Sequence, residues 1–86
     1  MSNLLSAEEY GLPKRVQLIQ MDINTIGIIK KRKSRIIMKD TAQIINIANH
    51  ILEKDNGVKI ALLISGPICS KSRKYLIEHS IDVVSD

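Results

Sequence analysis

The most highly charged feature of this 86-residue sequence is a run of bases. It holds five basic residues and no acid, namely Lys30, Lys31, Arg32, Lys33 and Arg35. Clustered cations of this kind bind phosphates. Each nucleic-acid phosphate that they neutralise steepens the fall of the logarithm of affinity with the logarithm of salt concentration by about one unit of slope. A solvated hairpin tip and attraction to an anionic lipid or protein surface are competing interpretations. The first functional hypothesis is therefore a nucleic-acid contact at these five residues.

The charge outside this run sharpens the hypothesis. The chain has a net charge of +4, yet Lys14 to Lys39 alone contains eight bases against one acid, Asp22. Tyr10 and Tyr75 are the only aromatic residues, so the sequence offers no platform on which unpaired bases could stack. Recognition of single strands is thereby disfavoured, and contact with the phosphate backbone of a duplex is favoured.

A second candidate site follows an apolar stretch and is rich in hydroxyl and basic groups. Free backbone N–H groups and the helix dipole attract anions at the start of a helix, and a helix is expected here. The expected anion-binding residues are Ser65, Gly66, Ser70, Lys71 and Ser72. The segment lacks the second glycine of a Walker A motif, so it does not indicate an NTPase. The simpler interpretation is that Gly66 and Pro67 only begin the helix.

The cysteine and histidine residues give weaker signals. Cys69 is the only cysteine, which rules out an internal disulfide or a cysteine-based zinc site within the chain. Lys71 and the expected helix start would lower the pKa of its thiol, whereas free cysteines are more often buried and inert. His50 and His79 have no neighbours at metal-ligand spacing, so no metal site is predicted from them.

The elements that position these residues can be predicted from hydrophobic periodicity. Alternation and branched residues predict an antiparallel meander of strands at 16–21, 25–29 and 35–38, with the basic run at the tip of its second hairpin. Apolar residues at helical spacing predict a helix from Asp40 or Thr41 to about Asp55, with Gly57 in a left-handed conformation after it. The last elements are expected as a strand buried on both faces at 58–64, a helix at 68–80 and a strand at 81–84.

The order of elements gives the fold class. With a short helix from Ala7 to about Tyr10, the sequence predicts a small three-layer α/β domain of order (α)βββαβαβ, an antiparallel meander followed by β-α-β-α-β. Residues 1–13 are expected to form an N-terminal arm or short helix, and residues 14–86 a single domain. No segment is long and apolar enough to span a bilayer, and no signal peptide is evident, so we expect a cytoplasmic protein without membrane contact.

The C-terminal third of the chain resembles the end of the Mrr-like restriction endonuclease domain. The resemblance lies in the apolar strand Gly57–Ile64, the small-residue loop Ser65–Pro67, the helix that follows and the terminal Ile81–Asp86 stretch. The preceding order is similar to the core of PD-(D/E)xK nucleases. By this resemblance Asp22 and Lys39 are catalytic residues, and Mg²⁺ is the cofactor if cleavage occurs. Ile37 stands where that family has its middle acid.

These observations lead to one main hypothesis and two alternatives. The main one is a nucleic-acid-binding domain with a restriction-endonuclease-like core, without cleavage activity and without a cofactor. The first alternative is a structural or regulatory interaction module, either a homodimer or a domain that binds an acidic protein. The second is a domain that binds a phosphorylated small molecule at residues 65–72. Outside the resemblance, Asp22 is a turn residue and Lys39 a base at a strand edge.

Overall fold

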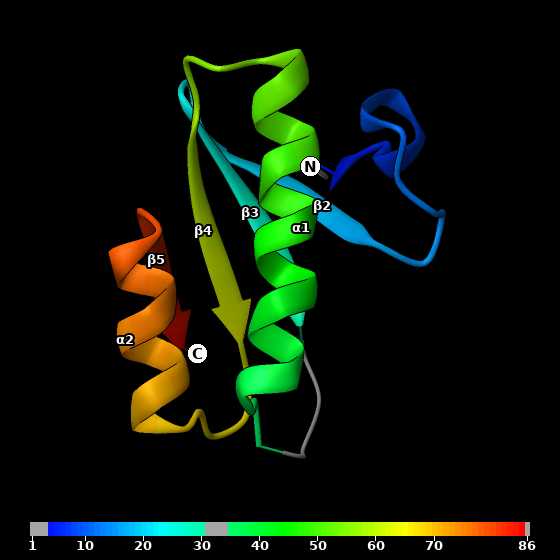
Figure 1. Cartoon of the computed structure of the whole chain (residues 1–86). Coiled ribbons are helices and arrows are strands. Elements are labelled where there is room, and N and C mark those ends of the chain that lie inside the picture. The colour runs from blue at the N-terminus through cyan, green and yellow to red at the C-terminus, as the bar shows by residue number, and fades with distance from the viewer. Residues whose placement is uncertain (1–3, 31–34, 86) are drawn as a thin grey trace.

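A computed structural model describes residues 4–30 and 35–85, which form a five-stranded mixed sheet and two α-helices (Figure 1). The predicted α/β class and the order of the main elements are confirmed. In chain order the elements are β1 (Leu4–Leu5), the 3₁₀ helix η1 (Ala7–Tyr10), β2 (Gln17–Asp22), β3 (Thr25–Lys30), α1 (Met38–Lys54), β4 (Lys59–Ile64), α2 (Ser70–Glu78) and β5 (Ile81–Ser85).

The sheet has the strand order β1-β2-β3-β4-β5. β1, β2 and β3 are antiparallel, whereas β3, β4 and β5 are parallel. A tight turn at Ile23 and Asn24 joins β2 to β3, and the backbone N–H of Ile23 donates to Asp22 Oδ1 at 2.7 Å. The two parallel connections each contain a helix, as crossover connections require.

The third strand of the meander was wrongly predicted. Residues 35–38 form no strand, and the antiparallel part of the sheet is completed instead by β1 at the N-terminus. Asp40 Oδ2 accepts a hydrogen bond from Ile37 N at 3.0 Å and Thr41 Oγ1 donates to Met38 O at 2.6 Å, so the helix begins at Met38. Lys30 therefore ends β3 ahead of a crossover connection, and not in a hairpin. Residues 31–34 of the basic run lie outside the described residues.

The helices bury the apolar stripes that the sequence predicts. On α1, Ile44, Ile47, Ala48 and Ile51 are buried. α2 is shorter than expected because Ile68 forms a bridge with Ile36, and the helix ends before Ser80, whose φ is 63°. The left-handed conformation expected at Gly57 is absent; Gly11, with φ of 72°, adopts it after η1.

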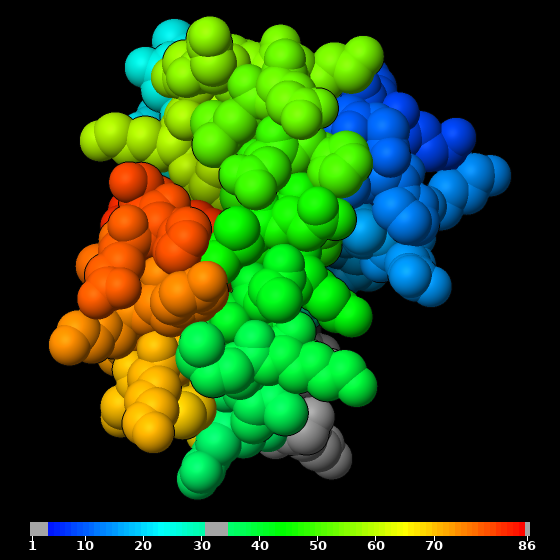
Figure 2. All heavy atoms as spheres, viewed as in Figure 1, coloured from blue at the N-terminus to red at the C-terminus, as the bar shows by residue number. Residues whose placement is uncertain are grey.

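Both helices lie on one face of the sheet, so the described residues form two layers and not the expected three (Figure 1). Because β3, β4 and β5 follow one another in the same direction across the sheet, two right-handed crossovers place both helices on the same side. Side chains of α1 and α2 cover most of this face, and the N-terminal segment lies beside α1 on the same face (Figure 2). The core lies between the layers and includes Leu18, Ile28, Ile44, Leu62 and Leu76, all fully buried.

The N-terminal residues contribute to the same core. β1 pairs with β2, and Ala7 and Leu12 are buried in the main apolar cluster. The sequence suggested an N-terminal arm or a short helix; the short helix is present as η1, and the part of residues 1–13 that the structure describes packs into the domain. Among the described residues, no helix has the length and apolar character needed to cross a membrane.

Candidate nucleic-acid interface

One edge of the sheet gathers the features that attract anions. β3, β4 and β5 all end there, because Lys30 pairs with Ile64 and Ile64 pairs with Ser85. The first turns of α1 and α2 begin at the same edge (Figure 1). We call this the carboxyl edge. In open α/β sheets ligands bind beyond the carboxyl ends of the strands, where helix N-termini add partial positive charge.

A pair of backbone hydrogen bonds joins the two candidate sites that the sequence suggested separately. Ile36 N donates to Pro67 O and Cys69 N donates to Ile36 O, each at 3.0 Å. Ile36 itself is only 1% exposed, so this contact is anchored in the core. It places Arg35, the last base of the basic run, next to the start of α2.

The carboxyl edge carries an excess of positive charge. Lys30 is half-buried at the end of β3, whereas Arg35, Lys39 and Lys71 are exposed. Asp40 is the acid in the first turn of α1, and its carboxylate accepts the hydrogen bond from Ile37 N. Lys31, Arg32 and Lys33 belong to the same run in the sequence but lie outside the described residues.

The predicted anion-binding loop is only partly available to a ligand. Ser65, Ser70 and Lys71 are exposed and Gly66 is half-buried. Ser72 is fully buried on the side of α2 that also buries Leu76, one helical turn later. The Ser72 hydroxyl therefore faces the protein interior and does not belong to the surface of the loop.

The structure does not bring Asp22 and Lys39 together. Asp22 ends β2 beside Thr25, where β3 begins, whereas Lys39 lies in the first turn of α1 at the carboxyl edge. The length of β3 separates these two ends, which is about 17 Å at 3.3 Å per residue. Within residues 4–30 and 35–85, no group of three His, Cys, Asp or Glu side chains is placed to hold a metal ion.

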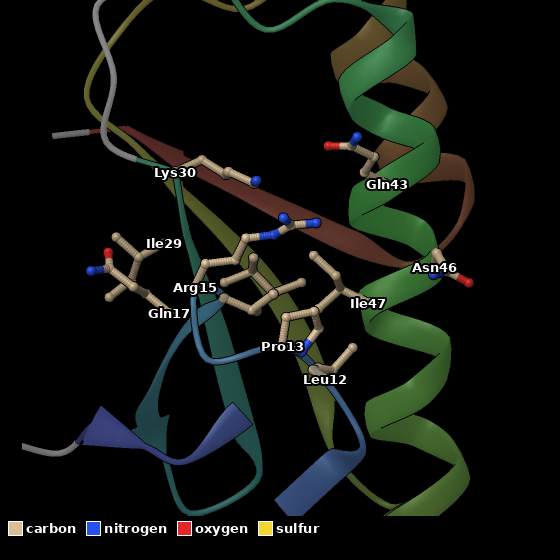
Figure 3. Close-up of a pocket in the computed structure, with 11 residues that line it drawn as sticks. Leu12, Pro13, Arg15, Gln17, Ile29, Lys30, Gln43, Asn46 and Ile47 are labelled. Carbon is tan, nitrogen blue, oxygen red and sulfur yellow. The ribbon is translucent and has the colours of Figure 1, made fainter. Parts of the chain in front are cut away.

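A cavity of about 290 Å³ adjoins the carboxyl edge at Lys30 (Figure 3). Arg15, Lys30 and Gln43 point toward one another across it, above an apolar floor that includes Leu12, Ile28 and Ile47. No acidic residue lines it. This cavity is not evident from the sequence, because Arg15 and Lys30 approach one another through the β2–β3 register, in which Gln17 pairs with Ile29, and Gln43 comes from α1.

No protein-family model, curated protein or solved structure matches this chain. The resemblance to Mrr-like nucleases thus remains a hypothesis from the sequence. The class that the fold and the site define is a small two-layer α/β domain with a basic carboxyl edge.

Cys69 gives an independent measure of the electrostatics at the carboxyl edge. The thiol is partly exposed, and its pKa is lowered mainly by the backbone N–H of Ser72, then by that of Lys71, with the Ser72 hydroxyl and the charge of Arg35 adding to the effect against desolvation. The thiolate is the reactive form, so the rate of alkylation by iodoacetamide rises with pH. Its midpoint, the pH at which the rate is half of its maximum, should be lower than for a free cysteine, whose pKa is about 8.5.

The variant Arg35→Gln should move this alkylation midpoint back to higher pH, because it removes a positive charge that favours the thiolate. Lys14→Gln removes an equal charge from a residue that does not act on Cys69, so its midpoint should stay at the wild-type value. A wild-type midpoint at or above that of free cysteine would contradict the contact of the thiol with the backbone N–H groups at the start of α2, and a midpoint that Arg35→Gln leaves unchanged would contradict the placement of Arg35 beside Cys69.

Proposed function

We propose that this domain binds the phosphate backbone of duplex nucleic acid at its carboxyl edge. The observation that carries the proposal is the backbone pairing of Ile36 with Pro67 and Cys69. It joins the basic run to the start of α2, so that Arg35, Lys39 and Lys71 lie at the same end of the sheet as Lys30, the last residue of β3. A phosphate chain passing this edge would meet successive cations and the positive end of a helix dipole.

The chemistry of the edge favours backbone contact over base recognition. Its functional side chains are Lys and Arg, which position a duplex through its phosphates, and the chain has no Phe or Trp on which a base could stack. Affinity would therefore depend strongly on salt and weakly on sequence. The separation of Asp22 from Lys39 supports binding without cleavage in a restriction-endonuclease-like core. The lone free thiol suits the reducing cytoplasm.

The direct test is a salt titration of binding to a fluorescein-labelled DNA duplex, followed by fluorescence anisotropy. Four cations at the described edge predict that the logarithm of the affinity falls with the logarithm of salt concentration with a slope of about −4. The three further bases of the basic run would steepen the slope to about −6. Absence of binding at low salt, or a slope near zero, would contradict the proposal.

Two controls separate binding from catalysis. Asp22→Asn alters the opposite edge of the sheet, so duplex affinity should not fall. Plasmid DNA incubated with Mg²⁺ or Mn²⁺ should remain intact. Cleavage that disappears in Asp22→Asn would restore the nuclease hypothesis and overturn the inference that this core only binds.

The cavity at Arg15 supports a second candidate function, the binding of a small organic anion with an apolar body. Arg15 and Lys30 converge there with no acid among the lining residues, and neither has an ion-pair partner among the described residues. An anionic headgroup would relieve their repulsion, while Leu12, Ile28 and Ile47 would contact the body. At about 30 Å³ per non-hydrogen atom, taking the volume of a water as the measure, the cavity fits a ligand of about ten such atoms.

Octanoate, octyl phosphate and octanol are suitable probes of the cavity, because they share one chain and differ in charge. We expect saturable amide shifts at Gln43 and Ile47 in NMR titrations with at least one of the two anions, and none with octanol. Arg15→Gln should abolish these shifts, and Lys14→Gln, outside the cavity, should leave them unchanged. Equal binding of octanol, or no response to either anion, would reject this candidate.

A further inference from the structure

We call the face of the sheet that is turned away from α1 and α2 the outer face (Figure 1). Strand residues alternate between faces, so the neighbours of core residues such as Leu18, Ile28 and Leu62 point to this side. The strand register aligns these neighbours in rows across the sheet, because partners directly opposite one another share a face. The large apolar side chains of the outer face are Ile19, Met21, Ile29, Leu63 and Val84.

No helix among the described residues covers the outer face. Met21 is 41% exposed and Val84 is 42% exposed, while Leu4, which pairs with Ile19, is 65% exposed. Met21 also lies across Gly27, where an added Cβ would approach its sulfur to 2.8 Å. Parallel strands such as β3, β4 and β5 are normally covered on both faces. The exposed apolar side chains therefore indicate a surface that another polypeptide covers.

The outer face carries few charges. Asp22, Lys59 and Asp82 are exposed at its margin, together with the uncharged Gln17, and Thr25 is half-buried between Asp22 and Lys59. The cations of the carboxyl edge belong to loops and helix starts, or, for Lys30, to the side of β3 that faces α1. An apolar centre with a polar rim is typical of a protein interface, and the face lacks the positive charge that a nucleic acid or an anionic membrane would need.

We propose that a second copy of this chain covers the outer face, forming a two-fold dimer in which the two sheets pack face to face. In an isologous interface each copy presents the same patch. Asp22 and Lys59 flank Thr25 in one row across β3, so a two-fold axis along β3 would place Lys59 of each copy opposite Asp22 of the other. A strongly charged foreign partner would find no such complement here. Two sheets pack about 10 Å apart with strand directions within about 30°, which suits a five-stranded sheet with one free face.

The size of the patch sets the expected strength of the dimer. Four strands of five or six residues, about 4.8 Å apart, with the two-residue β1 beside them, cover roughly 20 Å by 17 Å, or about 340 Å² on each copy. Because this is less than half of the roughly 800 Å² per partner of a standard interface, the dimer should be weak and should form only at high micromolar concentrations. Because the interface is apolar, raising the salt concentration should not weaken it, unlike the binding of nucleic acid.

Sedimentation velocity of the full chain, from low micromolar to several hundred micromolar, measures this association. We expect a monomer–dimer equilibrium for the wild type, and a monomer at every concentration for Val84→Glu and for Met21→Glu. Ile77→Glu is the matched control: Ile77 is 55% exposed on α2, away from the outer face, and its loss should leave the equilibrium unchanged. Circular dichroism establishes that each variant is folded.

A second measurement uses the wild type alone. Amide shifts of Ile29, Leu63 and Val84 should change with protein concentration along the same isotherm as the sedimentation data. A wild type that stays monomeric throughout would overturn the proposal. A dimer that survives Val84→Glu and Met21→Glu, or one that Ile77→Glu dissolves, would equally overturn it. None of these results depends on DNA, because the outer face contains no residue of the carboxyl edge.

Discussion

The double variant Arg35→Gln/Lys71→Gln should bind duplex DNA about 30-fold more weakly than the wild type at physiological salt, with a salt slope shallower by about two. Arg35 ends the basic run and Lys71 lies in the first turn of α2, yet the pairing of Ile36 with Pro67 and Cys69 makes them neighbours. Both side chains are exposed, so the substitutions should not unfold the domain. Fluorescence anisotropy across a salt series gives the affinity and the slope.

The matched control removes the same charge from elsewhere on the surface. Lys14→Gln/Lys54→Gln replaces two exposed lysines, one in an ion pair with Glu8 at 4.0 Å and one in the last turn of α1. Its affinity should fall less than about threefold, because only the long-range field changes. Equal losses in the two double variants would show that net charge alone governs binding, and that the carboxyl edge is not the site.

The parts of the fold that the sequence predicted correctly depend on local patterns. The α1 stripe of Ile44, Ile47 and Ile51 repeats at helical spacing, and β4 is an uninterrupted apolar run after Lys59. The sequence predicted β4 as buried on both faces, whereas the described helices cover only one face of the sheet. Such patterns specify which face is buried without reference to the rest of the chain. The order of elements follows from them, and with it the α/β class.

The errors concern choices that non-local contacts decide. Arg35 to Met38 has the composition of a strand, but the hydrogen bond from Ile37 N to Asp40 begins a helix there, and Ile36 pairs with Ile68 instead of with β3. The three-layer expectation failed because the number of layers depends on the direction in which β3, β4 and β5 follow one another, which periodicity does not encode.

The candidate site shows the same division between local and non-local information. The basic run and the loop at residues 65–72 are each visible in the sequence, whereas their adjacency depends on a contact between Ile36 and residues 67–69. The burial of Ser72 follows from the helix face on which it lies. Arg15 and Gln43 gain their possible role only through the register of β2 on β3 and the docking of α1.

Replacing Ile36 by alanine should lower the free energy of unfolding by about 3 kcal/mol, since it leaves a cavity where a fully buried isoleucine side chain was. The whole free energy of unfolding of a domain of this size is about 5–10 kcal/mol, so this loss is a large fraction of it. Ile37→Ala is the matched control: Ile37 is 49% exposed, and its loss should cost less than about 1 kcal/mol. Urea unfolding followed by circular dichroism measures both.

The same pair of variants tests whether the fold and the candidate site are coupled. The buried Ile36 side chain anchors the segment whose backbone hydrogen bonds hold Arg35 beside α2, so Ile36→Ala should loosen that segment and weaken duplex binding under conditions where the variant is still folded. Ile36→Val retains most of the buried volume and should preserve both stability and affinity better. If Ile37→Ala destabilised the domain more than Ile36→Ala, the buried side chain would be that of Ile37 and not that of Ile36. Arg35 would then not lie against α2, and the carboxyl edge would lose the contact that unites it.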